Sequence, residues 1–177
     1  MQRHWLIPDW DPGLTLAHLP LEPLIGRGIK VLLLDVDRTL LPGRGVELPA
    51  PMRRWAKDAS RLLHIHLISN NPSRQRIQAV ADQMNVTYTC SASKPRRGAI
   101  RRVISTLPNA TTEIAMVGDR VFTDVLAGNR LGLYTVLVKP PRPDGTACSH
   151  DRVQRLERHL ARFCLLYTSP SPRDGIG

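Results

Sequence analysis

The chain has 177 residues, a length that fits a single domain with a sizeable core. Lysine and arginine number 25 against 15 aspartate and glutamate, a net charge of +10, which favours anionic partners such as membranes or nucleic acid. No apolar run is long enough to cross a membrane, and the first residues lack a secretion signal. Three cysteines, odd in number and without zinc spacing, lead us to expect a reducing, cytoplasmic setting.

Aliphatic runs alternate with helical segments through the middle of the chain. Expected strands cover residues 29–36, 64–69, 86–89, 113–118 and 133–138, and expected helices cover residues 50–63, 73–84, 97–107 and 121–131. Strands that alternate with helices are typical of α/β proteins with a parallel, doubly wound sheet. We therefore expect a domain over residues 29–139, an N-terminal segment (1–28) packed on it, and a linker with a basic amphipathic helix (140–163).

The first expected strand ends in two acids. A continuous aliphatic run precedes Asp35 and Asp37, and Thr39 follows two residues later. Such a run is typical of a strand buried on both faces, whose end emerges at the carboxyl edge of the sheet, where open α/β folds bind ligands. Acids at such a place cost energy unless a cation or a chemical role holds them. The run predicts a metal or phosphoryl site; the alternative is a polar strand-to-loop turn.

The exits of three later strands also carry polar side chains. In chain order they offer Ser69 with Asn70, then Lys94, then Asp119 with Asp124. Acids suit a divalent cation, a hydroxyl and amides suit phosphate oxygens, and one ammonium neutralises negative charge. The four exits together therefore predict phosphate chemistry.

These residues resemble the four motifs of the haloacid dehalogenase (HAD) superfamily of phosphohydrolases. Asp35 to Thr39 matches its DxDxT motif, Ser69 the second motif, Lys94 the third, and Gly118 to Asp124 the GDxxxxD motif. All four occur in the family's order. The one departure is Arg38, at the variable position of the first motif, where relatives often carry a small polar residue.

Residues 118–132 are similar to one branch of the superfamily, the YqeG-type branch of subclass IIIA, and the stretch Ile68 to Asn71 supports the same branch. That branch resembles the phosphatidylglycerophosphate phosphatases of mitochondria and plastids. The resemblance covers roughly residues 28–139 and implies a HAD-like Rossmannoid fold.

The resemblance also implies a Mg²⁺-dependent mechanism through an aspartyl-phosphate. Asp35 would be the nucleophile, Asp37 the general acid and then the general base, and Lys94 the catalytic cation that neutralises charge. The phosphate-binding residues would be Thr39, Ser69, Asn70 and Lys94. The Mg²⁺ ligands would be Asp35, Asp37 (through its backbone carbonyl), Asp119 and Asp124.

The intervals between the motifs leave no room for a cap domain. Thr39 to Ser69 accommodates a turn and one helix, and Ser69 to Lys94 one helix and one strand. An uncapped site suits a phosphate on a large object, because small metabolites benefit from enclosure. We therefore expect a phosphatidylglycerophosphate phosphatase that acts on a lipid head group at the inner face of the cytoplasmic membrane. The alternatives are a HAD phosphatase for a nucleotide, a nucleic-acid end or a protein phosphate, and a basic RNA- or ribosome-associated binding protein with a vestigial site.

Residues 151–163 have a helical pattern with two interpretations. Val153, Leu156, Leu160 and Phe163 share one stripe, and arginines lie on and around the polar side. The pattern fits an interfacial helix in peripheral contact with an anionic membrane, and it also fits a helix docked on the core.

We interpret the last residues, 164–177, as a segment that does not belong to the natural protein. The peptide CLLYTSPSPRD, which begins at Cys164, resembles the translation of a transposon mosaic end with its sequencing adapter. We therefore expect residues 164–177 to be a sequencing artefact, the alternative being a natural tail, and we exclude them from fold reasoning.

Overall fold

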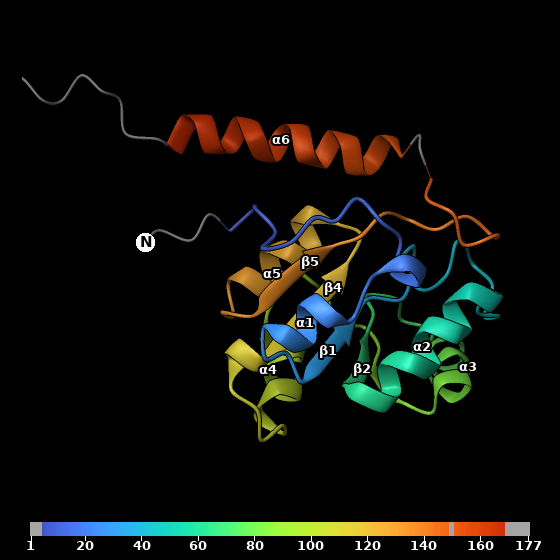
Figure 1. The fold of residues 1–177 in the computed structure, drawn as a ribbon. Helices are drawn as coiled ribbons and strands as arrows, with labels where there is room; N and C mark the ends of the chain where they lie inside the picture. Colours follow the sequence, from blue (N-terminus) through green and yellow to red (C-terminus); the bar gives the residue numbers. More distant parts are fainter. Residues whose placement is uncertain (1–4, 149–150, 169–177) are drawn as a thin grey trace, which may run out of the picture.

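A five-stranded parallel sheet forms the centre of the molecule in the computed structural model (Figure 1). The structure describes residues 5–148 and 151–168. The spatial order of the strands is β3-β2-β1-β4-β5. Their bounds are β1 (Val31–Leu34), β2 (His64–Ile68), β3 (Thr87–Thr89), β4 (Ile114–Gly118) and β5 (Tyr134–Leu137). The chain steps outward from β1 to β3, then crosses to β4 on the other side of β1, so β1 and β4 lie side by side at the topological switch.

The helices cover both faces of this sheet. Their bounds are η1 (Leu16–His18), α1 (Glu22–Gly26), α2 (Ala50–Leu62), α3 (Arg74–Met84), α4 (Gly98–Ser105), η2 (Thr111–Glu113), η3 (Val121–Val125), α5 (Leu126–Asn129) and α6 (Arg152–Thr168). Leu32 and Leu34 of β1 pack in the cluster that contains residues of α1, α2 and α3. Val31 and Leu33 pack in the opposite cluster, with residues of α4 and α5. This alternation explains the continuous aliphatic run, because each face of β1 is buried.

The doubly wound α/β fold without a cap is confirmed. The expected strands and helices between residues 29 and 139 are all present, with two differences. The first strand is shorter than expected and covers only Val31–Leu34, although the backbone N–H groups of Lys30 and Asp35 on either side still donate to the carbonyls of Glu113 and Val117. The helix expected over 121–131 is divided into a π-helical turn, η3, and the short α5. Between the motifs the chain forms only α2 and β2 in the first interval, and α3 with β3 in the second.

The N-terminal segment extends the sheet's edge. The Trp10 backbone N–H donates to the Thr135 carbonyl (3.0 Å), and the Leu137 N–H donates to the Trp10 carbonyl (2.9 Å). Leu16 and Leu24 are fully buried in the core cluster that contains α2. Of the expected artefact (164–177), residues 164–168 continue α6. Residues 169–177 lie outside the described residues. Within the described part of the chain, no helix is long and apolar enough to span a bilayer.

Candidate active site

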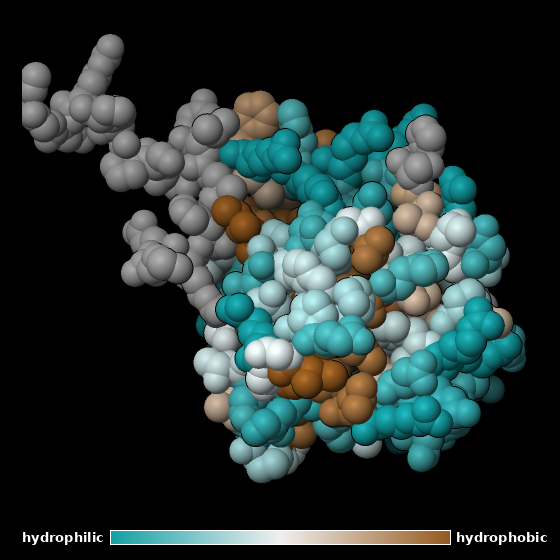
Figure 2. All heavy atoms as spheres, in the orientation of Figure 1, coloured by the Kyte–Doolittle hydropathy of each residue, from teal (hydrophilic) through white to brown (hydrophobic). Residues whose placement is uncertain are grey.

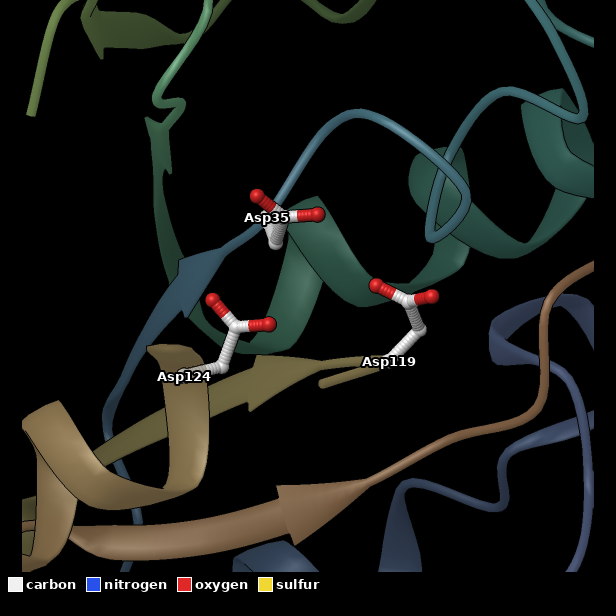
Figure 3. A group of neighbouring side chains, drawn as sticks. All are labelled: Asp35, Asp119 and Asp124. Atoms are coloured by element: carbon white, nitrogen blue, oxygen red, sulfur yellow. The ribbon is translucent and has the colours of Figure 1, made fainter. Parts of the chain in front are cut away.

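Three aspartates meet at the carboxyl edge of the sheet (Figure 3). Asp35 directly follows β1, Asp119 directly follows β4, and Asp124 lies in η3, so adjacent strands and one helical turn bring them together. One carboxylate oxygen of each lies within 4.8 Å of the others. All three are nearly inaccessible, with exposed fractions of 7%, 1% and 2%. The structure thus brings Asp119 and Asp124 of the fourth motif next to Asp35 of the first motif.

Lys94 supplies the positive charge inside this cluster. Its Nζ lies 2.5 Å from Asp35 Oδ1 and 2.7 Å from Asp124 Oδ1, and it donates to the Ile68 carbonyl at 2.9 Å. Burial alone would lower the pKa of this amine, but the two carboxylates outweigh burial and raise it. Lys94 is therefore a permanent cation between the expected nucleophile and an expected metal ligand.

The remaining negative charge is poorly compensated. Burial raises the pKa of Asp35 to about 6, although Lys94 acts in the opposite direction. Burial and the nearby charges of Asp124 and Asp35 raise the pKa of Asp119 to about 8, against the guanidinium of Arg38. The three buried carboxylates form an all-oxygen donor set, which fits a hard divalent cation such as Mg²⁺. A second positive centre beside Lys94 would also offset the repulsion between the carboxylates.

Gly118 allows Asp124 to fold back over the end of β4. A Cβ at this position would lie 2.3 Å from Asp124 Cγ, which no side chain tolerates. The Arg120 backbone N–H donates to Asp124 Oδ2 at 3.2 Å and helps to hold the side chain in place. The glycine of the GDxxxxD motif therefore makes room for its last acid.

The expected phosphate-binding residues surround the cluster with different partners. Thr39 Oγ1 donates to Asp35 Oδ2 at 3.2 Å, and Ser69 Oγ accepts from the Asn71 backbone N–H at 3.0 Å. Asn70 is bound on both sides to the backbone of Lys94: its Oδ1 accepts from the N–H (2.6 Å) and its Nδ2 donates to the carbonyl (3.0 Å). The Asn70 side chain thus positions Lys94, while the buried Ser69 donates a long hydrogen bond of 3.4 Å to Asp37 Oδ2.

The carboxylate of Asp37 lies outside the cluster of three acids. Its Oδ1 pairs with an Arg76 guanidinium nitrogen at 2.7 Å, and its side chain is 40% exposed. Sequence reasoning did not single out Arg76. Arg76 lies in the first turn of α3, the helix that follows the second motif, and this position was the one signal in the sequence. No local pattern connects Arg76 to Asp37 of the first motif.

Arg38 connects the cluster of three aspartates to the C-terminal part of the chain. Its φ of +64° is uncommon for a residue other than glycine and turns the side chain back over the site. Its Nε donates to Asp119 Oδ2 at 3.1 Å, and its guanidinium also pairs with Asp151. The sequence identified Arg38 only as a departure from the family pattern. Its contacts with Asp119 and Asp151 do not follow from its position in the motif.

α6 binds the segment between Asp119 and Asp124 from the outside. Gln154 Nε2 donates to the backbone carbonyl of Asp119 at 2.7 Å. Glu157 Oε2 accepts from the Val121 N–H at 2.9 Å, and its Oε1 pairs with Arg120. Gln154 and Glu157 are both buried, so the structure adds these two α6 residues to the surroundings of the site.

Comparison with known proteins agrees with this geometry. A family model described as HAD-hydrolase-like matches residues 91–153. The probable phosphatase YqeG of Bacillus subtilis (strain 168) is 26% identical over 166 residues, which cover 93% of this chain and 92% of that protein. The chloroplastic/mitochondrial phosphatidylglycerophosphate phosphatase 1 of Arabidopsis thaliana is 26% identical over 156 residues, 83% of this chain and 45% of the plant protein.

Among solved structures, a haloacid dehalogenase-like hydrolase from Brucella suis 1330 matches with a TM-score of 0.50 and 14% identity, over 76% of this chain and all of that chain. This likeness shows the fold alone. The similarity to the HAD-hydrolase-like family model and to the YqeG phosphatase agrees with the buried acids and lysine at the sheet edge. The protein is a phosphatase that resembles HAD hydrolases. Within that class, its sequence is similar to the YqeG phosphatase over nearly the full length of both chains.

Proposed function

We propose that the protein is a Mg²⁺-dependent phosphate monoester hydrolase that works through a phosphorylated Asp35, and that its substrate is phosphatidylglycerophosphate. The observation that carries the mechanism is the ammonium of Lys94 between Asp35 and Asp124, with Asp119 in the same cluster. Phosphoryl transfer needs positioning and charge stabilisation more than any other contribution, and this arrangement supplies both.

In the first step, an oxygen of Asp35 attacks phosphorus, the bond from phosphorus to the alcohol oxygen breaks, and Asp37 gives its proton to the leaving oxygen. In the second step, Asp37 takes a proton from water, the water oxygen attacks phosphorus, and the bond to Asp35 breaks. Thr39 and Lys94 each bind one oxygen of Asp35 and hold the carboxylate in place. Asp35, Asp119 and Asp124, with the backbone carbonyl of Asp37, would hold Mg²⁺, which when bound would supply positive charge to the phosphoryl oxygens.

Two observations support a lipid phosphate as the substrate. The chain is similar to a phosphatidylglycerophosphate phosphatase over 83% of its length. The site also lacks a cap, so a head group that stays in a bilayer could approach the exposed Asp37. An enclosed site would favour small soluble esters.

A phosphate-release screen tests the substrate. It compares phosphatidylglycerophosphate in mixed micelles with nucleotide monophosphates, sugar phosphates and a phosphopeptide, each with Mg²⁺. We expect kcat/KM for the lipid to exceed the others by about a hundredfold or more. A higher value for a nucleotide, sugar or peptide would assign the protein to another phosphatase function.

Asp35→Asn tests the nucleophile and serves as the inactive control in the same screen. The amide keeps the size of the side chain but removes the attacking charge. We expect kcat to fall on the order of 10⁴-fold with every substrate, as for other nucleophile replacements. Turnover near the wild-type value in a folded variant would exclude a phosphorylated Asp35.

A further inference from the structure

Exposed apolar side chains concentrate on α6 and the segment beside it. Among the described residues, nine large hydrophobic side chains are exposed, and six of these belong to two neighbouring segments. Those six are Val153, Leu156, Leu160 and Phe163 of α6 with Trp5 and Ile7 of the N-terminal segment. The other three, Leu14, Ile25 and Leu62, belong to three different segments. Figure 2 shows hydrophilic residues over most of the face drawn, with hydrophobic residues in separate patches. A concentration of this kind marks an interaction surface.

The N-terminal segment and α6 are neighbours in the fold. Leu6 packs in one cluster with Ala161 of α6 and Val121 of η3. Arg158 of α6 pairs with Asp11, with nitrogen and oxygen 2.9 Å apart. The exposed Trp5 and Ile7 therefore lie along the same side of the molecule as the helix.

α6 docks on the domain through a face other than its apolar stripe. Gln154, Glu157 and Ala161 are buried against the domain, whereas Leu156 and Phe163 are 59% and 51% exposed. At 3.6 residues per turn, the four apolar residues form one stripe on the flank of the helix, centred roughly 110° around its axis from those three. The helix is thus docked on the domain, as the second interpretation of its sequence pattern predicted. Its hydrophobic stripe, however, stays exposed and is available to a partner.

Positive charge lies beside the stripe. Arg152, Arg155 and Arg162 are exposed, and no ion pair engages their side chains among the described residues; Arg158 is the one paired with Asp11. At helical spacing these three arginines share the outer half of α6 with the stripe. A helix with leucine and phenylalanine beside arginines is typical of one that lies in the interface of an anionic bilayer.

We propose that the outer face of α6, defined as Val153, Leu156, Leu160, Phe163 and the arginines Arg152, Arg155 and Arg162, binds the surface of an anionic lipid bilayer, with Trp5 and Ile7 at its margin. A bilayer is favoured over a protein partner because the stripe is convex, lies on a single helix and has cations beside it. The proposal deepens the lipid-phosphatase function and, for its biological meaning, rests on it.

The same helix holds the catalytic edge. Asp151, just before α6, pairs with Arg38, and Gln154 bonds to the backbone of Asp119. A helix that is bound outward to lipid and inward to the motif loops would keep the site close to the bilayer surface. Membrane docking and support of the site would then use different faces of one helix.

Vesicle sedimentation tests the surface without turnover. The full chain, in EDTA at low salt, is mixed with vesicles of equal parts phosphatidylglycerol and phosphatidylcholine, or of phosphatidylcholine alone. We expect binding to the anionic vesicles, with Leu156→Asn/Leu160→Asn weakening it about tenfold or more. We expect Arg152→Gln/Arg155→Gln to weaken it roughly tenfold and to flatten its salt dependence.

Matched variants on other helices serve as controls. Leu62→Asn with Ile25→Asn removes two equally exposed apolar side chains, and Arg101→Gln with Arg102→Gln removes two exposed arginines of α4. We expect both controls to bind vesicles as wild type does, and all variants to hydrolyse p-nitrophenyl phosphate normally. Loss of that activity in an α6 variant would reveal misfolding, and the single variants Leu156→Gln and Leu160→Gln would then take its place.

Three outcomes would overturn the proposal: no vesicle binding by wild type, equal losses in the control variants, or a concentration-dependent dimer that the leucine variants abolish. The last would assign the surface to a second copy of the chain. Failure of the substrate screen is distinguishable, because a protein that does not hydrolyse lipid phosphate would still sediment with vesicles if the surface is correct.

Discussion

Asp35 and Asp37 are separated by one residue, but their surroundings prepare them for different tasks. Asp35 is buried against Lys94 and bonded to Thr39. The carboxylate of Asp37 is half-exposed, away from the acid cluster, where Arg76 holds it by an ion pair. A fixed, shielded carboxylate suits a nucleophile, and an accessible one suits proton transfer to a leaving group at the rim.

Asp37→Asn separates these two roles. An amide cannot protonate the leaving oxygen, so alkyl phosphates should lose about 10²- to 10⁴-fold in rate. p-Nitrophenyl phosphate should lose far less in its first step, because nitrophenolate leaves without a proton. Burst kinetics with both esters measure that step. Equal losses for the two esters would argue against a general-acid role.

Arg38→Gln tests whether the arginine beside the three aspartates opposes metal binding. Its guanidinium binds Asp119 Oδ2 at 3.1 Å and so competes with a cation for that oxygen. We expect the variant to need roughly three- to tenfold less Mg²⁺ for half-maximal thermal stabilisation. Arg44→Gln, an exposed arginine of the following loop, is the control and should match wild type. An unchanged or higher Mg²⁺ requirement would show that Arg38 does not oppose the metal.

At the scale of elements, α6 and the π-helical turn η3 depend on each other. η3 places Asp124, and its first backbone N–H, that of Val121, is satisfied by Glu157 of α6. π-helical turns are uncommon and frequently occur at functional sites, where they need support from their surroundings. The C-terminal helix therefore belongs to the structure of the site as well as to the surface.

Glu157→Ala measures that support. The change leaves the buried Val121 N–H without its acceptor and Arg120 without its partner. We expect the free energy of unfolding, measured with urea, to fall by about 1–3 kcal/mol, and the Mg²⁺ requirement to rise. Arg155→Ala, on the exposed face of the same helix, should leave both unchanged. A variant as stable as wild type would mean that η3 holds its shape alone.

At the scale of the whole molecule, the buried acids make stability depend on pH and metal together. Burial raises the pKa of Asp119 to about 8 and the pKa of Asp35 to about 6 when no metal is bound. In the unfolded chain these carboxyls release their protons near pH ~4. Because the folded state holds more protons in this window, the stability from these groups is full below pH ~4 and is lost as the pH rises to about 8.

Mg²⁺ should reverse this loss, since it replaces the protons that the cluster would otherwise hold. We expect the increase in Tm on adding Mg²⁺ to metal-free protein to be larger near pH 8 than near pH 5, as scanning calorimetry can measure. Asp119→Asn should remove most of the difference between the two pH values. Equal increases at both would mean that Mg²⁺ does not bind at these carboxylates.

The sequence by itself determined the fold class and the order of the polar residues at the strand exits. Both are local properties: a strand buried on both faces is a continuous aliphatic run, and the residue after it must emerge at the sheet edge. Asp35, Asp119 and Lys94 could be assigned to one place because each follows a strand of one parallel sheet, and every parallel strand ends at the same edge.

Only the tertiary structure decided the contacts between residues distant in the chain. Arg38 and Asp151 are 113 positions apart, and no local pattern pairs one arginine among many with one acid. The sequence also showed that α6 is amphipathic without showing which face docks. Gln154 and Glu157 turn inward because they satisfy the backbone of Asp119 and Val121, and this demand exists only once the sheet and η3 have formed. Leu156 and its neighbours are left outside for the same reason, since a helix has only one face to bury against the domain.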